Sequence, residues 1–167
     1  MVTKISEVKY LIETGVSNPK TTFSEIRKMA ESDDWKVREV AATVLVEISK
    51  NKADEVISEM VDWADDIDPN VRRTSSEGLR DLARKNPEKV LPVIEKLKTD
   101  ENLYVKKSVA NVLRNASRYN SGFVLGLCKN WAFLKNKNTD WIIKGGLRKL
   151  KESHSKQVDD ILGSLGV

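Results

Sequence analysis

The sequence predicts an all-α fold, a solenoid of about five antiparallel helix pairs. The first observation behind this prediction is a valine that recurs at a constant interval. The valines are Val37, Val71 and Val105. The second is a short polar residue three positions before each valine, of a kind that caps helix N-termini. These residues are Asp34, Asp68 and Asn102. Internal periods of this size are typical of helical repeat arrays.

The third observation is that the apolar residues between these copies repeat as well. Met29, Trp63 and Leu97 are separated by the same interval as the valines. A looser fourth copy is expected after a step three residues longer, with Thr139 as its N-cap and Leu150 as its late core leucine. The same longer step places three residues in the last core columns: Cys128, Trp131 and Leu134. Each unit then consists of two amphipathic helices, A and B.

The helix boundaries follow from caps and breakers. Gly15 is expected to close the first helix, Thr22 to cap the second, Pro69 to take a first helical position and Ser121 to cap the eighth helix. The expected helices, in chain order, are 3–14, 22–31, 35–50, 53–65, 69–85, 87–98, 103–118, 122–134, 140–152 and 155–165.

Composition favours one ordered domain over residues 1–167. The chain is 40% hydrophobic and 32% charged, and it has no apolar run of the roughly 18 residues that a membrane span needs. Cys128 is the single cysteine, which excludes an internal disulfide and fits a buried thiol in a reducing compartment. We therefore expect a cytoplasmic protein without membrane contact.

The charge is unevenly distributed. Residues 1–100 have a balance of −3, and residues 101–167 have a balance of +7. A basic half of this kind indicates an acidic partner, most often nucleic acid. On charge alone, a solubilising surface is an equal alternative.

The motifs of two other repeat families are missing. The tetratricopeptide Trp-x-x-Leu-Gly-x-x-Tyr pattern and the ankyrin Thr-Pro-Leu-His pattern do not occur. A HEAT-like repeat with short loops fits better.

Basic residues recur at the start of successive A helices. Stacked A helices would turn them into a ridge across the solenoid that could neutralise DNA phosphates. Solvated helix ends paired with nearby acids are the alternative. The candidate DNA-binding residues are Arg38, Arg72, Arg73, Lys106, Lys107, Lys144 and Arg148. Further cations stand later in these helices, at Arg80, Arg114 and Lys151. Aromatic contacts to the partner are expected from Trp35, Tyr104 and Trp141, although such residues also staple helix starts.

Catalytic chemistry would have to rest on carboxylates. The one histidine, His154, allows no histidine dyad or metal cluster, and no zinc spacing or phosphate-binding loop occurs, so we expect no metal and no cofactor. Glu77 is the best candidate acid, since it stands in the small-residue stretch before Gly78. An ion pair with Arg73 or Arg80 is its structural alternative.

Three stretches in order resemble the bacterial alkylpurine DNA glycosylases of the AlkC/AlkD type. They cover 71–80, 104–113 and 140–150, within a likeness that spans 33–151. The resemblance implies a HEAT-like crescent whose A helices line a concave, basic face that binds double-stranded DNA. It also implies excision of N3- or N7-alkylated purines, with a carboxylate that stabilises the oxocarbenium ion and indole rings that cradle the sugar.

Matched residue by residue, the resemblance is incomplete. Glu77 matches the acidic position of the AlkC-type motif, and Arg73 matches a DNA-contacting arginine of the AlkD type. The AlkD-type catalytic aspartate falls on Arg38 or Glu39, and a tryptophan of that family is replaced by Asn111. We therefore expect a DNA-binding protein whose glycosylase site is partly degenerate. A non-catalytic scaffold for a protein partner is the alternative.

Overall fold

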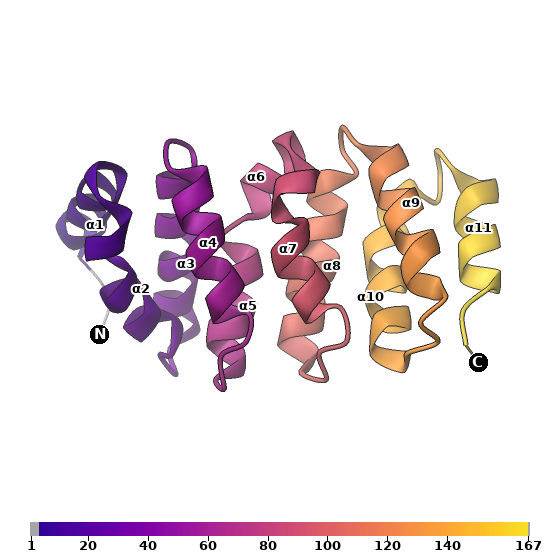
Figure 1. Ribbon diagram of the computed structural model, residues 1–167, viewed down its shortest axis with the longest axis horizontal. Coiled ribbons are helices and arrows are strands. Elements are labelled where there is room, and N and C mark those ends of the chain that lie inside the picture. The colour runs from indigo at the N-terminus through magenta and orange to yellow at the C-terminus, as the bar shows by residue number, and fades with distance from the viewer. Residues whose placement is uncertain (1–3, 167) are drawn as a thin grey trace.

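The computed structural model describes residues 4–166, which contain eleven α-helices and two short 3₁₀ turns (Figure 1). The α-helices are α1 (Ile5–Ser17), α2 (Phe23–Ala30), α3 (Trp35–Ser49), α4 (Ala53–Trp63), α5 (Pro69–Glu77), α6 (Arg80–Lys85), α7 (Pro87–Leu97), α8 (Leu103–Ala116), α9 (Ser121–Ala132), α10 (Lys137–Leu147) and α11 (Ser155–Gly163). The 3₁₀ turns are η1 (Pro19–Thr21) and η2 (Arg148–Leu150). The all-α prediction is confirmed.

The helices form two layers along one long axis. Figure 1 shows α4, α7, α9 and α11 nearer the viewer, with α3, α5, α8 and α10 behind them. We call the rear set, together with α1 and α6, the A layer, and the front set, together with α2, the B layer. Within the A layer α3 contacts α5, α5 contacts α8, and α8 contacts α10. Equivalent positions of successive repeats therefore lie side by side.

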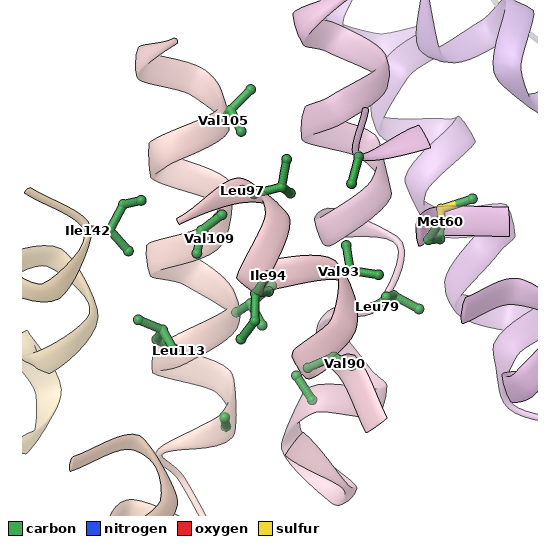
Figure 2. Packing of buried hydrophobic residues seen from close by; sticks show 14 of the residues in the cluster. Met60, Leu79, Val90, Val93, Ile94, Leu97, Val105, Val109, Leu113 and Ile142 are labelled. Carbon is green, nitrogen blue, oxygen red and sulfur yellow. The ribbon is translucent and has the colours of Figure 1, made fainter. Parts of the chain in front are cut away.

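One hydrophobic core runs between the layers from α1 to α11. Figure 2 shows part of it, where Ile94 and Leu97 of α7 lie beside Val109 and Leu113 of α8. A single leucine column extends through all five A positions at the constant interval of the valines. Its members, all buried, are Leu11, Leu45, Leu79, Leu113 and Leu147. Cys128 is also in the core, and burial raises the pKa of its thiol to about 12, as a structural thiol requires.

The same turn precedes α3, α5 and α8. Asp68, the N-cap of α5, illustrates it: its own N–H donates to Asp66 Oδ1 at 2.9 Å, and its Oδ1 accepts from Asn70 N at 2.7 Å. Equivalent pairs precede α3 (Ser32, Asp34) and α8 (Asp100, Asn102). These side chains satisfy N–H groups that a helix start leaves unpaired, which is why the helices begin there. The three predicted N-caps are confirmed.

The fourth repeat departs from the prediction. Its N-cap is Asn136, whose Oδ1 accepts from Asn138 N and Thr139 N at 2.9 and 3.1 Å. Thr139 lies inside α10, fully buried, with its hydroxyl bonded to Lys98 O at 2.8 Å. The interval of the first three repeats therefore continues, and the longer step expected for the fourth is wrong. The two possible registers of the fourth repeat differ by three residues, which is about one helical turn, so the apolar pattern alone fits both.

The corrected step changes the last core columns. Cys128 aligns with Met60 and Ile94, and Leu147 takes the leucine position that was predicted for Leu150. Leu134, predicted as core, is 47% exposed because α9 ends at Ala132.

The helix predicted at 69–85 is broken into α5 and α6 at Gly78 and Leu79. A Cβ on Gly78 would lie 2.8 Å from Leu45 Cβ, so glycine permits close packing against α3. Just before the break, the hydroxyls of Ser75 and Ser76 donate to carbonyls three residues earlier, at 2.6 and 3.1 Å. Such bonds compete with the helical pattern, and glycine weakens it further.

Gly15 does not close the first helix, which continues to Ser17. Its added Cβ would lie 2.2 Å from Ile48 Cδ1, so this glycine also permits close packing with α3. Ser121 is the first residue of α9, and Asn120 holds the cap position. Residue 3, predicted to begin the first helix, lies outside the described residues. Among residues 4–166 no helix is both long and apolar enough to cross a bilayer.

Candidate nucleic-acid interface

One side of the A helices carries a continuous polar surface, formed by positions i, i+4 and i+7 of each helix. These positions share one helical face, and the side-by-side packing of the A helices aligns them into three rows. The first row is Glu39, Arg73, Lys107 and Trp141; the second is Thr43, Glu77, Asn111 and Gly145; the third is Arg80, Arg114 and Arg148, because the α3 position of this row is the buried Val46. We call these residues the A-face.

Glu77 lies near the centre of the A-face, with its side chain 12% exposed. Its Oε2 is 3.5 Å from the donating Asn111 Nδ2 and 3.9 Å from Arg80 Nη1. Burial raises the pKa of this carboxyl above its ordinary value; Arg73, Arg80 and the Asn111 bond oppose that shift, and Glu39 adds to it. The result is a partly desolvated carboxylate, a group that can stabilise an adjacent cation.

The N-terminal half of the A-face is an ion-pair network. Glu39 lies 3.7 Å from Arg73 Nη2 and 3.5 Å from Arg80 Nη1, and so links α3 to both α5 and α6. Arg80 Nη2 also donates to Thr43 Oγ1 at 3.3 Å. The two arginines therefore share two carboxylates, Glu39 and Glu77, and their charge is largely compensated.

The C-terminal half of the A-face is different. Arg114 Nη1 donates to Gly145 O at 3.0 Å, a bond to a neutral acceptor. Burial lowers the pKa of Arg114 and the nearby Arg148 lowers it further, whereas Glu77 acts in the opposite direction. In the part of the chain that the structure describes, neither Arg148 nor Lys107 has a carboxylate within ion-pair distance. Uncompensated positive charge therefore collects on α8 and α10.

Arg38 and Arg72 lie off the A-face and bind the turns that precede their own helices. Arg38 Nη1 donates to the carbonyls of Ser32 and Asp33 at 2.7 and 2.9 Å. Arg72 donates in the same way to two carbonyls of its turn, and its Nε donates to Asp100 at 2.7 Å. These two guanidiniums have structural partners, so we do not include them in the interface.

Lys106, Lys107 and the exposed aromatics lie at the start of α8 and α10. Lys106 Nζ donates to Asn138 Oδ1 at 3.1 Å and stands 5.6 Å from the ring centre of Trp141. Lys107 Nζ stands 5.4 Å from the ring centre of Tyr104. Trp141 and Tyr104 are 37% and 61% exposed. A cleft of about 520 Å³ opens beside them, lined by Glu101, Lys106, Lys137, Asn138 and Trp141.

Two further candidates fall elsewhere. Trp35, 64% exposed at the start of α3, has Lys36 Nζ 6.0 Å from its ring, but α5 and α8 separate its helix from α10, which carries Trp141. Lys144 does not continue the row of Arg73 and Lys107; with the constant interval that place belongs to Trp141, and Lys144 lies on the outer flank of α10. The sequence pattern also placed Lys151 after Arg80 and Arg114; with the constant interval that place belongs to Arg148.

The comparisons agree with this architecture. A comparison with protein-family profiles matches residues 23–114 to the family described as HEAT repeats. A search of curated protein sequences gave no match. Among solved structures, the chain resembles the alkylpurine DNA glycosylase AlkC of Pseudomonas fluorescens, bound to DNA containing an abasic site analog, with a TM-score of 0.78 and 24% identity over 93% of this chain and 44% of that chain. This chain therefore spans less than half of that protein.

AlkD2 from Streptococcus mutans is also similar, with a TM-score of 0.72 and 27% identity over 85% of this chain and 70% of that chain. The HEAT-like solenoid predicted from the sequence is confirmed. The resemblance to the AlkC/AlkD type is confirmed at the level of the fold.

Proposed function

We propose that this chain, which belongs to the HEAT-repeat family, binds double-stranded DNA on its A-face. The observation that carries the proposal is the group of Lys107, Arg114 and Arg148. Lys107 and Arg114 lie on α8 and Arg148 begins η2, directly after α10; none of the three has a carboxylate within ion-pair distance in the described part of the chain. Like charges gathered in this way repel one another, and a bound anion removes that repulsion.

Duplex DNA supplies anions in a row. Adjacent A helices pack roughly 8–10 Å apart, so the cations of α8 and α10 form one patch that can meet several phosphates of a strand. Tyr104 and Trp141, exposed beside the lysines, offer flat apolar surfaces to the sugars between those phosphates. The DNA-bound AlkC structure with a similar fold supports this choice of partner.

The enzymatic part of the proposal is hydrolysis of the N-glycosidic bond of N3- or N7-alkylated purines. The bond between C1′ and the base nitrogen breaks, and its electron pair leaves with the base, which neutralises the lesion's positive charge. Water then adds to C1′ and gives up a proton. The carboxylate of Glu77, which the A-face places between α8 and α6, is the group that would stabilise the cationic sugar.

The same geometry supports a degenerate site that binds DNA without cleaving it. Glu77 already lies against Arg80 and Asn111, so its carboxylate is partly occupied before a cationic sugar could reach it. Activity and binding are therefore tested separately.

Binding is tested by titrating a short duplex at several salt concentrations. The slope of log affinity against log salt gives the number of phosphate contacts, at about 0.9 per contact. Lys107→Gln with Arg148→Gln should weaken binding and make the slope less steep. The control is Lys129→Gln with Lys156→Gln, two exposed lysines on B helices. An equal loss of DNA affinity in both variants, or no DNA binding at low salt, would contradict the proposal.

Activity is tested by release of 3-methyladenine or 7-methylguanine from alkylated DNA. Glu77→Gln should abolish release and keep DNA binding, because the amide has the same shape without the charge. Release that survives this substitution would remove Glu77 from the reaction. DNA binding without any release by the unmodified chain would establish the degenerate form.

A protein scaffold is the second candidate. An apolar cleft of about 270 Å³ between α9 and α11 favours it, since Leu125, Ile161 and the 75% exposed Phe133 lie at its surface. This cleft lies in the B layer, so its occupancy by a protein is compatible with DNA on the A-face.

A further inference from the structure

The outer flank of α10 differs from the same flank of the other A helices. In α3, α5 and α8, one flank position is always small and buried: Ala42, Ser76 and Ala110. A second position, seven residues later, is small in every repeat as well. Its residues are Ser49, Ala83 and Ser117, all buried. Small side chains there let the next A helix approach.

On α10 and the turn after it, the two positions are Lys144 and Lys151, and both are exposed. A buried lysine ammonium without a partner is strongly disfavoured, so this flank is not built to receive another A helix. Within residues 4–166 no A helix follows α10, and α11 packs against α9 and α10 in the B layer.

The flank is a basic stripe with one indole in it. Its residues recur at intervals of four and three, which keeps those within α10 on one side of the helix. They are Lys137, Trp141, Lys144, Arg148 and Lys151. Arg148 and Lys151 follow in η2 and the turn after it, where both residues keep a right-handed helical backbone. None of its four cations has a carboxylate within ion-pair distance in the described part of the chain. Lys137 and Lys144 are separated by about 10 Å along the axis, from a rise of about 1.5 Å per residue.

Two residues of this stripe, Trp141 and Arg148, also belong to the A-face. The cleft beside Trp141 also joins the A-face to the stripe, since Lys106 of α8 and Lys137 of α10 both line it. Glu101 is the one acidic residue that lines this cleft, so the cleft joins the positive surface of α8 to that of α10.

We propose that the DNA-binding surface turns around α10, so that Lys144 and Lys151 on its outer flank contact phosphates of the same duplex as Lys107 and Arg114. The proposal rests on the proposed function and adds the direction in which the duplex leaves the A-face. The ion-paired N-terminal half, with Glu39 shared by Arg73 and Arg80, then lies outside the main footprint.

A simpler role for these lysines is that of a polar cap, which keeps the exposed end of a repeat array from self-association. The two roles differ in what the lysines contact. A cap affects association of the protein with itself, whereas a phosphate contact affects the salt dependence of DNA binding.

The experiment uses two double variants on the same short duplex. The flank variant combines Lys144→Gln and Lys151→Gln, and the control variant combines Lys129→Gln and Lys156→Gln. Both pairs remove two positive charges from exposed sites, so a general effect of net charge appears in both. Each lost phosphate contact should lower the steepness of the salt slope by about 0.9, so we expect the flank variant to lower it by about 2. The control should leave the slope unchanged.

Each outcome is decisive. An unchanged slope and affinity in the flank variant overturn the inference, and self-association in sedimentation under the same conditions then assigns the lysines to a cap. If the salt slope is unchanged in the flank variant but less steep in the double variant Lys107→Gln and Arg148→Gln, the proposed function stands and the inference fails. If the unmodified chain binds no DNA, the proposed function itself fails. Circular dichroism of each variant confirms that it is folded.

Discussion

The hydroxyl oxygens of Ser76 and Ser108 lie 2.6 Å apart and join α5 to α8 inside the A layer. Both side chains are buried, and each also lies within hydrogen-bond distance of a carbonyl three residues earlier, at 3.1 Å for Ser76 and 2.7 Å for Ser108. The two hydroxyls have two protons for these three bonds, so whichever serine donates to the other gives up the bond to its own carbonyl. This bond links the repeat that holds Glu77 to the repeat that holds Lys107 and Arg114.

A double-mutant cycle with Ser76→Ala and Ser108→Ala should show this coupling. Each single variant should lose about 1 kcal/mol of unfolding free energy, because the remaining hydroxyl can still donate to its own backbone carbonyl. The double variant should lose less than the sum, since the shared bond is removed only once. Urea unfolding measures all three values, and strictly additive losses would mean that the bond contributes no energy.

Glu77 should make stability depend on pH in an identifiable direction. Because its pKa is raised in the folded chain, the protonated form is favoured by folding, and Glu77 destabilises the fold at neutral pH relative to a neutral side chain. Glu77→Gln should therefore raise the free energy of unfolding at pH 7. The difference should shrink as the pH falls through the raised pKa of the folded chain and reach its low-pH limit below the unfolded pKa. Thermal unfolding of both proteins across this range measures it; a difference that grows on acidification would contradict the sign.

Gly146 is required for the contact between α8 and α10. A Cβ at this position would lie 2.6 Å from Leu113 Cδ1 and 2.9 Å from Leu113 Cβ. Gly146→Ala should therefore destabilise the fold by about 1–3 kcal/mol through overpacking. Gly126→Ala is the matched control inside α9, where an added Cβ meets nothing within 4 Å. It should stabilise the fold by up to about 1 kcal/mol through helix propensity. Chemical denaturation compares the two.

Arg72 should matter for stability and not for DNA. Its guanidinium bonds two carbonyls of its own turn and the Asp100 carboxylate, whose side chain is only 9% exposed. Arg72→Gln leaves these acceptors without a charged donor and should cost about 1.5–3 kcal/mol. The salt slope of DNA binding should be unchanged, in contrast to Lys107→Gln with Arg148→Gln. A lower slope in a folded Arg72→Gln protein would return this residue to the interface.

The repeat period predicted the fold because each helix start carries its own local signal. Asp34, Asp68 and Asn102 cap their helices through bonds to residues two positions later, and such bonds depend on sequence alone. The fourth copy was misplaced by three residues for a physical reason. One helical turn is about 3.6 residues, so a shift of three keeps most apolar side chains on the buried side. Only the cap, Asn136 rather than Thr139, distinguishes the two registers.

The candidate site could be predicted only in part. The positions of Arg73, Lys107 and Glu77 follow from the repeat, whereas the place of Arg148 was given to Lys151 because the fourth copy was misplaced. What they contact does not follow, because ion pairs form between helices. Glu39, one repeat before Arg73, compensates the charge of Arg73 and Arg80, while Arg114 finds only the carbonyl of Gly145. The break at Gly78 was also missed. The helix-propensity penalty of one glycine is too small to predict a break, and the close packing against Leu45 that requires glycine is a contact between helices.

The loop between α9 and α10 keeps the cap at Asn136 but lacks the second half of the turn that precedes α3, α5 and α8, the side-chain acceptor for the N–H of the capping residue. Leu134 occupies the place of Ser32, Asp66 and Asp100 and has no oxygen to offer, and the next residue, Lys135, has a φ of 50°, which costs a non-glycine residue energy. We therefore expect the array to open first at this junction. When the protein is transferred to deuterated water, the amides of α10 and α11 should exchange sooner than those of α8. Opening would then begin at the C-terminal repeat, which carries Lys144, Arg148 and Lys151, so a bound polyanion should slow that exchange most.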